Sequence, residues 1–121
     1  MGPQGPSTVR AQWAEATGST PIGSLTVLPG MSVSITTDRT DTISIQGNVN
    51  VFTDKDTFIY VYLDGEPVGT ASYTSVVNAW NNVPFFVMRN VTAGNHTVTL
   101  RGSANGSNAR VGARVLTVTA F

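Results

Sequence analysis

The residue types that carry most enzyme chemistry are scarce in this chain. It has one histidine, His96, and no cysteine. A Ser-His-Asp triad would have to use His96, but the last acidic residue of the chain, Glu66, lies far before it. His96 belongs to the turn-like sequence Ala93-Gly94-Asn95-His96-Thr97, in which a histidine is usually solvated. We therefore expect His96 to have no catalytic role.

The aspartates offer a second candidate chemistry, the binding of a hard cation such as calcium. Asp38 with Asp41, and Asp54 with Asp56, are spaced so that two carboxylates of one loop could bind one ion. Neither pair is completed by the Gly and Glu of a calcium loop, and aspartates in such loops commonly cap backbone N–H groups. One histidine and no cysteine also exclude the usual zinc spacings. We predict no catalytic residue, no metal ligand, no cofactor and no enzymatic activity.

Aromatic side chains are the remaining candidates for ligand contact. Tyr60 and Tyr62 fall on one face of a predicted strand, and Trp80 follows in a stretch, residues 78–82, without regular pattern. Rings in these positions could stack on sugars. The competing interpretation is packing in the core or at a subunit interface, because aromatic residues dominate both environments.

Three arginines lie close together near the C-terminal end. Arg110 and Arg114 share one parity of the last predicted strand, and Arg101 precedes them. We expect them to pair with acidic groups of a neighbouring subunit or to be solvated.

Composition and charge restrict the classes of partner. The chain has 121 residues, the length of one domain, and its seven basic and seven acidic side chains cancel. A net charge of zero provides no electrostatic footprint for nucleic acid, and no apolar run is long enough to span a membrane. Lys55 is the only lysine, although lysines commonly protect exposed strand edges. The composition therefore favours a protein whose edges are covered by partner chains.

Alternating apolar and polar residues predict strands along most of the chain, and no convincing helix appears. Turn residues separate these strands at intervals typical of two packed antiparallel sheets. The sequence therefore predicts an all-β fold, an antiparallel β-sandwich or jelly roll of about eight strands. The main predicted strands are residues 24–28, 31–36, 42–52, 58–63, 70–76, 83–88, 97–101 and 109–121.

Local signals add detail to these strands. Asp64-Gly65 is the strongest hairpin signal, and Pro29-Gly30 predicts another turn. Gly47 interrupts a clean strand, which indicates a bulge or a close approach of the backbone. A change of parity at Val115–Leu116 predicts a bulge in the last strand.

The first residues contain a fragment of collagen-like sequence. Collagen needs Gly at every third residue over a long run, so this fragment is too short to form a triple helix. It suggests that the domain assembles with two other copies about a three-fold axis. The alternative is an ordinary disordered tail. We expect an extended N-terminal arm over residues 1–20 and a β-sandwich over residues 21–121. Because proline lowers the entropy lost on docking, the arm suits contact with a neighbouring subunit. The expected contact residues are Gly2, Pro3, Gln4, Gly5, Pro6, Val9 and Trp13.

Four segments together carry a family resemblance. They are residues 60–69, 82–86, 92–101 and 115–119, in the order strand, Asp-Gly turn, strand, Ala-Gly-Asn-His-Thr-Val, strand and final strand. Over about residues 40–121 this order resembles the trimeric jelly-roll modules at the C-terminal ends of bacteriophage virion proteins and bacterial collagen-like proteins.

The resemblance implies a non-enzymatic structural protein of a phage virion, a homotrimer that decorates or stabilises the particle. Its expected partners are copies of itself and other virion proteins, such as the major capsid or tail protein, with no nucleic acid and no membrane. Such a protein is assembled in the host cytoplasm and carried on the extracellular particle. The near absence of a stalk favours a capsid decoration or minor virion protein over a long fibre. The alternative is a receptor- or carbohydrate-binding tip module of a tail fibre, a head fibre or a bacterial collagen-like surface protein, which would contact a host-surface glycan.

Overall fold

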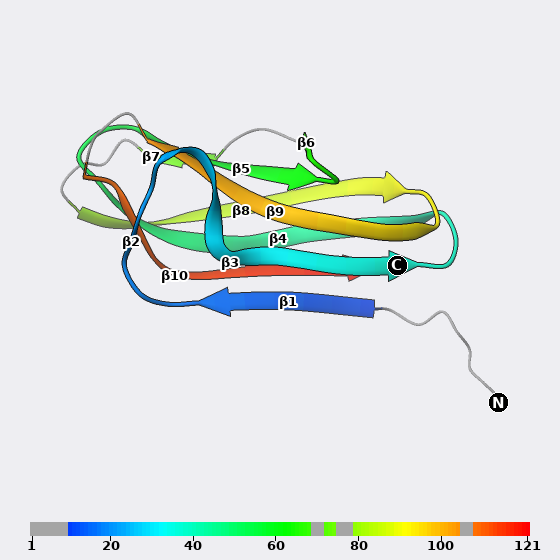
Figure 1. Cartoon of the computed structure of the whole chain (residues 1–121). Coiled ribbons are helices and arrows are strands. Elements are labelled where there is room, and N and C mark those ends of the chain that lie inside the picture. Colours follow the sequence, from blue (N-terminus) through cyan, green and yellow to red (C-terminus); the bar gives the residue numbers. More distant parts are fainter. Residues whose placement is uncertain (1–9, 69–71, 75–78, 105–107) are drawn as a thin grey trace.

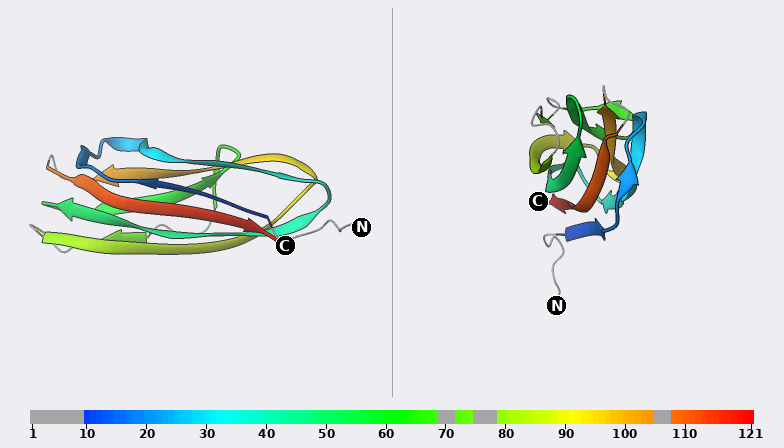
Figure 2. Two further views of the ribbon diagram at one scale, coloured as in Figure 1. Left: turned by 90° about the horizontal axis from the view of Figure 1, so that it is seen from below. Right: turned by 90° about the vertical axis from the view of Figure 1, so that its left-hand side faces the viewer.

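The computed structural model describes residues 10–68, 72–74, 79–104 and 108–121. These residues form two antiparallel sheets that run side by side along the long axis of the molecule, and the end-on view shows them as two layers (Figures 1 and 2). The described ranges contain no helix that could cross a membrane. The arm residues Gly2, Pro3, Gln4, Gly5, Pro6 and Val9 lie outside the described residues.

Each sheet has five strands, and every pairing between neighbours is antiparallel. This architecture confirms the predicted all-β sandwich of the jelly-roll type. The first sheet has the order β1 (Arg10–Ala16), β10 (Arg110–Ala120), β4 (Asp41–Thr53) and β8 (Ala79–Val91), with β2 (Thr20–Pro21) also on β10. The second sheet has the order β3 (Ser24–Thr37), β9 (Gly94–Ala104), β5 (Thr57–Leu63) and β6 (Glu66–Pro67), with β7 (Ser72–Thr74) also on β5.

One apolar core fills the space between the sheets. It follows from period-2 patterning, because alternate residues of a strand face opposite sides of its sheet. Along β4 the apolar side chains Ile43, Ile45, Val49 and Val51 are buried, and most side chains of the alternate positions are partly exposed. The fully buried large side chains are Leu28, Met31, Ile43, Ile45, Val49, Val51, Ile59, Val98, Leu100, Val111, Leu116 and Val118.

Residues 10–16 of the segment expected to form an arm are strand β1. This strand pairs with β10 along its whole length, from Arg10 opposite Ala120 to Ala16 opposite Arg114. Most of its side chains are exposed, so backbone pairing contributes more than side-chain burial to its position. A strand that is held mainly by backbone pairing has a weak hydrophobic pattern, so its sequence carries little alternation of apolar and polar residues.

Two local predictions are confirmed. Asp64 and Gly65 both have positive φ, 52° and 85°, between the paired residues Leu63 and Glu66. This is the conformation that a tight hairpin turn requires. At Gly47 a Cβ atom would lie 2.0 Å from the carbonyl oxygen of Val115, so the close backbone approach is real.

The turn predicted at Pro29-Gly30 is wrong. Both residues lie inside β3, and the strand continues through them. The register with β9 shifts between Val27 and Ser32, and Gly30 takes a φ of 79° within this irregularity. The turn residues therefore produce a distortion of one long strand rather than a reversal of the chain.

The bulge predicted at Val115–Leu116 is also misplaced. The register between β10 and β4 shifts between Val111 and Arg114. Arg114 is buried and Val115 is only half-buried, so the inward positions of β10 resume at Arg114 rather than at Leu116.

Candidate ligand-binding face

The outer face of the first sheet combines amide side chains with aromatic rings. Along β4 the outward parity carries Gln46, Asn48, Asn50 and Phe52. Their partners on β8 are Phe86, Pro84, Asn82 and Trp80, respectively. Amides can both donate and accept hydrogen bonds, and aromatic rings provide flat apolar surfaces. A face of this composition can recognise a ligand that is polar at its rim and apolar on its plane.

The larger hollow on this face lies where β1 ends and β10 bulges. Its volume is about 530 Å³, which is within the range of small-molecule sites. Three asparagines and one carboxylate supply most of its polar groups. The lining residues are Glu15, Ala16, Thr17, Asn48, Asn50, Asn82, Ala113, Arg114 and Val115.

A second hollow lies further along the same two strands. It has a volume of about 410 Å³ and is lined by Phe52, Trp80, Asn108 and Arg110. Asn50 of β4 is paired with Asn82 of β8. The next outward-facing pair along the two strands is Phe52 with Trp80. The two hollows are therefore successive parts of one polar and aromatic strip.

Trp80 lines the smaller hollow. Its ring centroid is 5.6 Å from that of Phe52, with an angle of 55° between the planes. The indole also lies close to Gly112 of β10, since a Cβ atom there would be 2.9 Å from Cζ3 of the ring. The side chain is nevertheless 47% exposed. Trp80 thus presents an indole that is held by these two contacts and open to solvent.

Arg114 is a buried residue in the lining of the larger hollow. Its guanidinium donates hydrogen bonds to three carbonyl oxygens, those of Pro29 (3.0 Å), Gly18 (3.2 Å) and Gly112 (2.6 Å). These bonds connect the β10 bulge to β3 and to the segment after β1. Burial lowers the pKa of Arg114, although a guanidinium stays protonated in proteins.

The expectation that Arg114 would be solvated or pair with a neighbouring subunit is therefore wrong. Its guanidinium is buried and makes its contacts within the chain. A charged residue on the inward parity of an otherwise apolar strand was the signal that could have identified this role.

The structure separates the aromatic residues that the sequence offered as one group. Tyr60 and Tyr62 are half-buried on β5, in the second sheet, whereas Trp80 lies on β8 in the first sheet. The guanidinium carbon of Arg101 is 4.4 Å from the ring centroid of Tyr62, so this ring is partly covered. Trp80 is also part of a regular strand, which corrects the irregular stretch predicted around it.

Trp13 lies on the same outer face as Trp80. Trp13 of β1 begins a row of residues that lie opposite one another across the sheet. The row continues through Thr117 of β10 and Gln46 of β4 to Phe86 of β8. Trp13 and Phe86 are 65% and 60% exposed. The row therefore has an exposed ring at each end, on β1 and on β8, and polar residues between them. Sequence reasoning missed Phe86 because its significance depends on the register of four strands.

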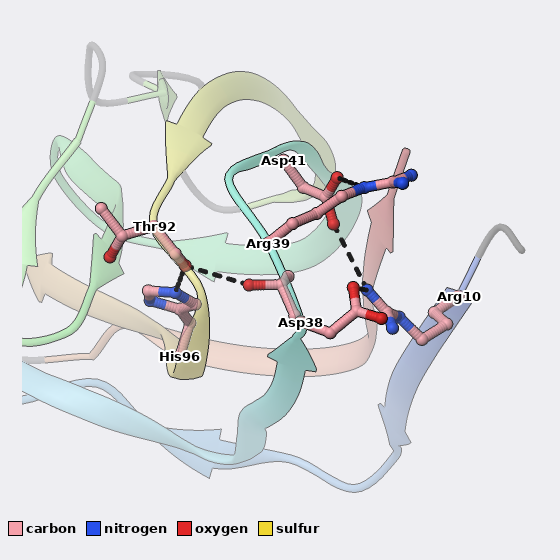
Figure 3. Close-up of polar contacts among 7 residues, drawn as sticks. Arg10, Asp38, Arg39, Asp41, Thr92 and His96 are labelled. Atoms are coloured by element: carbon pink, nitrogen blue, oxygen red, sulfur yellow. Dashed lines mark hydrogen bonds and ion pairs between the residues drawn. The ribbon is translucent and has the colours of Figure 1, made fainter. Parts of the chain in front are cut away.

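His96 is buried in an ion pair, which corrects the prediction of a solvated side chain. Its Nδ1 is 2.7 Å from Oδ2 of Asp64. Its Nε2 is 2.7 Å from the carbonyl oxygen of Thr92 (Figure 3). Both ring nitrogens therefore face acceptors, and the doubly protonated imidazolium satisfies both. Hydrogen bonding to Asp64, followed by that to Thr92, raises the pKa of His96.

Asp64 is the other half of this pair. Partial burial alone would raise its pKa, but hydrogen bonds from His96 and from the backbone N–H of Thr97 (2.8 Å) outweigh burial and lower the pKa of Asp64. The contact holds the Asp64-Gly65 turn against β9. Its role is structural, and the sequence concealed it because the two residues are 32 positions apart.

Three of the four aspartates considered as cation ligands have contacts within the protein. Asp41 accepts hydrogen bonds from Arg10 (3.3 Å) and Arg39 (3.0 Å), and Arg10 is also 3.8 Å from Asp38 (Figure 3). Asp54 accepts the backbone N–H of Asn108 at 3.3 Å, which is a loop-capping contact. Within the described ranges, no three His, Cys, Asp or Glu side chains gather in a way that could hold a metal ion.

Comparison of sequences finds no matching family model and no matching curated protein. In structure, the chain is similar to the CBM36-1 domain of a multidomain xylanase from the hindgut metagenome of Trinervitermes trinervoides. The TM-score is 0.52 at 16% identity, over 90% of this chain and 96% of that domain.

Two further solved structures share the fold. VP2 in the subviral particle of infectious bursal disease virus has a TM-score of 0.58 at 18% identity, over 92% of this chain and 32% of VP2. Dimeric latent PorU from Porphyromonas gingivalis has a TM-score of 0.59 at 8% identity, over 93% of this chain and 12% of PorU. At these identities the likeness concerns the fold alone. It supports the jelly-roll architecture that the resemblance implied and does not single out a bacteriophage protein.

Proposed function

We propose that this chain is a non-catalytic module that binds carbohydrate on the outer face of its first sheet. The observation that carries the proposal is Trp80, an exposed indole that lines the smaller hollow, one outward position along β8 from Asn82 of the larger hollow. A pyranose ring has an apolar C–H face and a rim of hydroxyl groups. The indole suits the face, and Asn48, Asn50 and Asn82 suit the rim.

The charged groups of the hollows support a binding role over a hydrolytic one. Among the described residues that line them, Glu15 is the single carboxylate. Most glycoside hydrolases need two carboxyl groups on either side of the scissile bond. The fold likeness to the CBM36-1 domain, a carbohydrate-binding module by its name, agrees with this function, although identity is too low to transfer site residues.

Replacement of Trp80 tests the proposal. We expect Trp80→Ala to weaken binding of the preferred glycan on an array by about tenfold or more, because stacking on the indole is lost. Tyr60→Ala is the matched control, since Tyr60 lies on the second sheet, and should leave binding unchanged. A wild-type chain that binds no glycan on a broad array would refute the function, and equal losses in both variants would refute the site.

A structural subunit of a particle is the second candidate, and it includes the trimeric phage-virion protein that the sequence resemblance implies. The observation that favours it is the set of exposed apolar side chains Trp13, Phe86, Met88 and Phe121 on a chain with few charges. Exposed apolar residues that gather on one face are typical of protein interfaces. VP2 of a virus particle shares the fold, which agrees with such a role.

Light scattering of the purified chain tests this second candidate. A stable trimer that Phe86→Ser converts to monomer would support it, and a monomer at high protein concentration would count against it. Removal of residues 2–9, which leaves β1 complete, tests the arm separately. Undiminished incorporation of the shortened chain into particles would refute a role for the arm.

A further inference from the structure

We propose that the carbohydrate is an acidic polysaccharide, whose carboxylate binds Arg110 in the smaller hollow while its neighbouring sugars lie along β4 toward the larger hollow. This inference rests on the proposed carbohydrate-binding function and adds the chemical class and direction of the ligand.

Arg110 carries a positive charge that no carboxylate of the described residues neutralises by an ion pair. Its Nη1 donates to the neutral hydroxyl of Ser19 at 3.2 Å, and the residue is exposed. The other arginines near the ends of β1 and β10 differ. Arg10 and Arg39 face aspartates, and Arg114 is buried against carbonyl oxygens. Arg110 is thus suited to receive an anionic group of a ligand.

The composition of the hollow around Arg110 favours a carboxylated sugar over a simple anion. Phe52 and Trp80 provide its apolar surface, and Asn108 adds a polar side chain. A guanidinium can bind a carboxylate through two parallel hydrogen bonds, and the indole beside it can stack on the ring that bears the carboxylate. A uronic acid residue combines both features.

At the opposite end of the strip the exposed charge is negative, because Arg114 in that hollow is buried against carbonyl oxygens and Glu15 is exposed. Glu15 lines the larger hollow together with the three asparagines, and no arginine or lysine of the described residues forms an ion pair with it. A carboxylate here would repel an acidic sugar, and it would accept hydrogen bonds from the hydroxyl groups of a neutral sugar. From Asn48 to Phe52 the strip covers four residue steps of β4, about 13 Å, which is longer than one sugar ring. The ligand is therefore an oligosaccharide with an acidic and a neutral end.

Titration calorimetry with matched polysaccharides tests this inference. The probes are hyaluronan, alginate and polygalacturonate, each compared with its carboxyl-reduced neutral form. We expect at least one acidic polymer to bind about tenfold or more tightly than its neutral form at low salt, and this preference to shrink as salt is added. Arg110→Gln should remove the preference. Glu15→Gln should strengthen binding of polygalacturonate, which is acidic at every residue.

Arg89→Gln is the matched control. Arg89 is an exposed arginine on β8 that lines neither hollow, and its guanidinium donates to the carbonyl oxygen of Met88. It should keep the preference for the acidic polymer. Thermal unfolding of all variants verifies that each is folded, and Arg110→Lys, which keeps the charge, should retain part of the preference.

The outcomes separate this inference from the function on which it rests. Equal binding of acidic and neutral polymers, lost in Trp80→Ala, would overturn the acidic ligand and leave carbohydrate binding intact. A preference for acidic polymers that Arg110→Gln does not reduce would overturn the role of Arg110. Failure of every glycan to bind would overturn both proposals.

Discussion

At the scale of single residues, the charged side chains that face inward have clear structural roles. His96 holds a turn against β9, and Arg114 joins the β10 bulge to β3 and to the segment after β1. Each of them makes at least one hydrogen bond to a group far away in the sequence, His96 to Asp64 and Arg114 to Pro29 and Gly18. A buried polar group without hydrogen-bond partners would destabilise the folded state, and buried polar groups in proteins are therefore nearly always hydrogen-bonded.

The His96–Asp64 pair makes stability depend on pH. The pKa of His96 is raised in the folded state, so its contribution is complete below the unfolded value of about 6.5 and is lost as pH rises through the folded value. The pKa of Asp64 is lowered, so its contribution is present above about 3.8 and is lost as pH falls through the folded value. The pair therefore stabilises the fold most between these two pH values.

Urea unfolding of the wild-type chain and His96→Gln checks this dependence. We expect the variant to be less stable near pH 5.5 by on the order of 1 kcal/mol, because Asp64 is half-exposed and solvent screens the pair. The difference should shrink as pH rises into the alkaline range. A difference that stays constant from acid to alkaline pH would contradict the protonated pair.

At the scale of elements, the contact between β4 and β10 is close at one point. Leu116 lies opposite Gly47, and the carbonyl of Val115 occupies the space where a side chain at position 47 would begin. β10 lies between β1 and β4 and connects them. The register of these two strands also places Asn48 beside Val115 in the larger hollow. Gly47 thus supports both the sheet and the larger hollow on its outer face.

Gly47→Ala should separate these strands locally. The added Cβ would meet backbone rather than a flexible side chain, so we expect a loss of about 2–4 kcal/mol in the free energy of unfolding. Gly23→Ala is the control, because its Cβ would meet only Thr26 side-chain atoms at 3.5 Å, an ordinary contact. Chemical denaturation measures both, and equal stability of the two variants would contradict the close approach.

At the scale of the whole molecule, the sequence predicts the architecture much better than the site. In segments such as 42–52, apolar and polar residues alternate because one face of the strand is buried. This pattern of burial determines the fold and can be read directly from the sequence. The hollows instead depend on which outward residues become neighbours across β1, β10, β4 and β8. That register is a property of pairing between distant segments, so Trp80 was found as a single residue while Glu15 and the three asparagines were missed.

The antiparallel pairing of β1 with β10 has a practical consequence for how this molecule can be handled. Because Arg10 lies opposite Ala120, both strands reach the same end of the sandwich, whereas Arg110 marks the far end of β10, about 30 Å away. A fluorescent tag or surface linker attached after Phe121 would therefore sit remote from the smaller hollow. Immobilised in this orientation, the chain would expose that end to the solution, which suits measurement of the proposed glycan binding on a sensor surface.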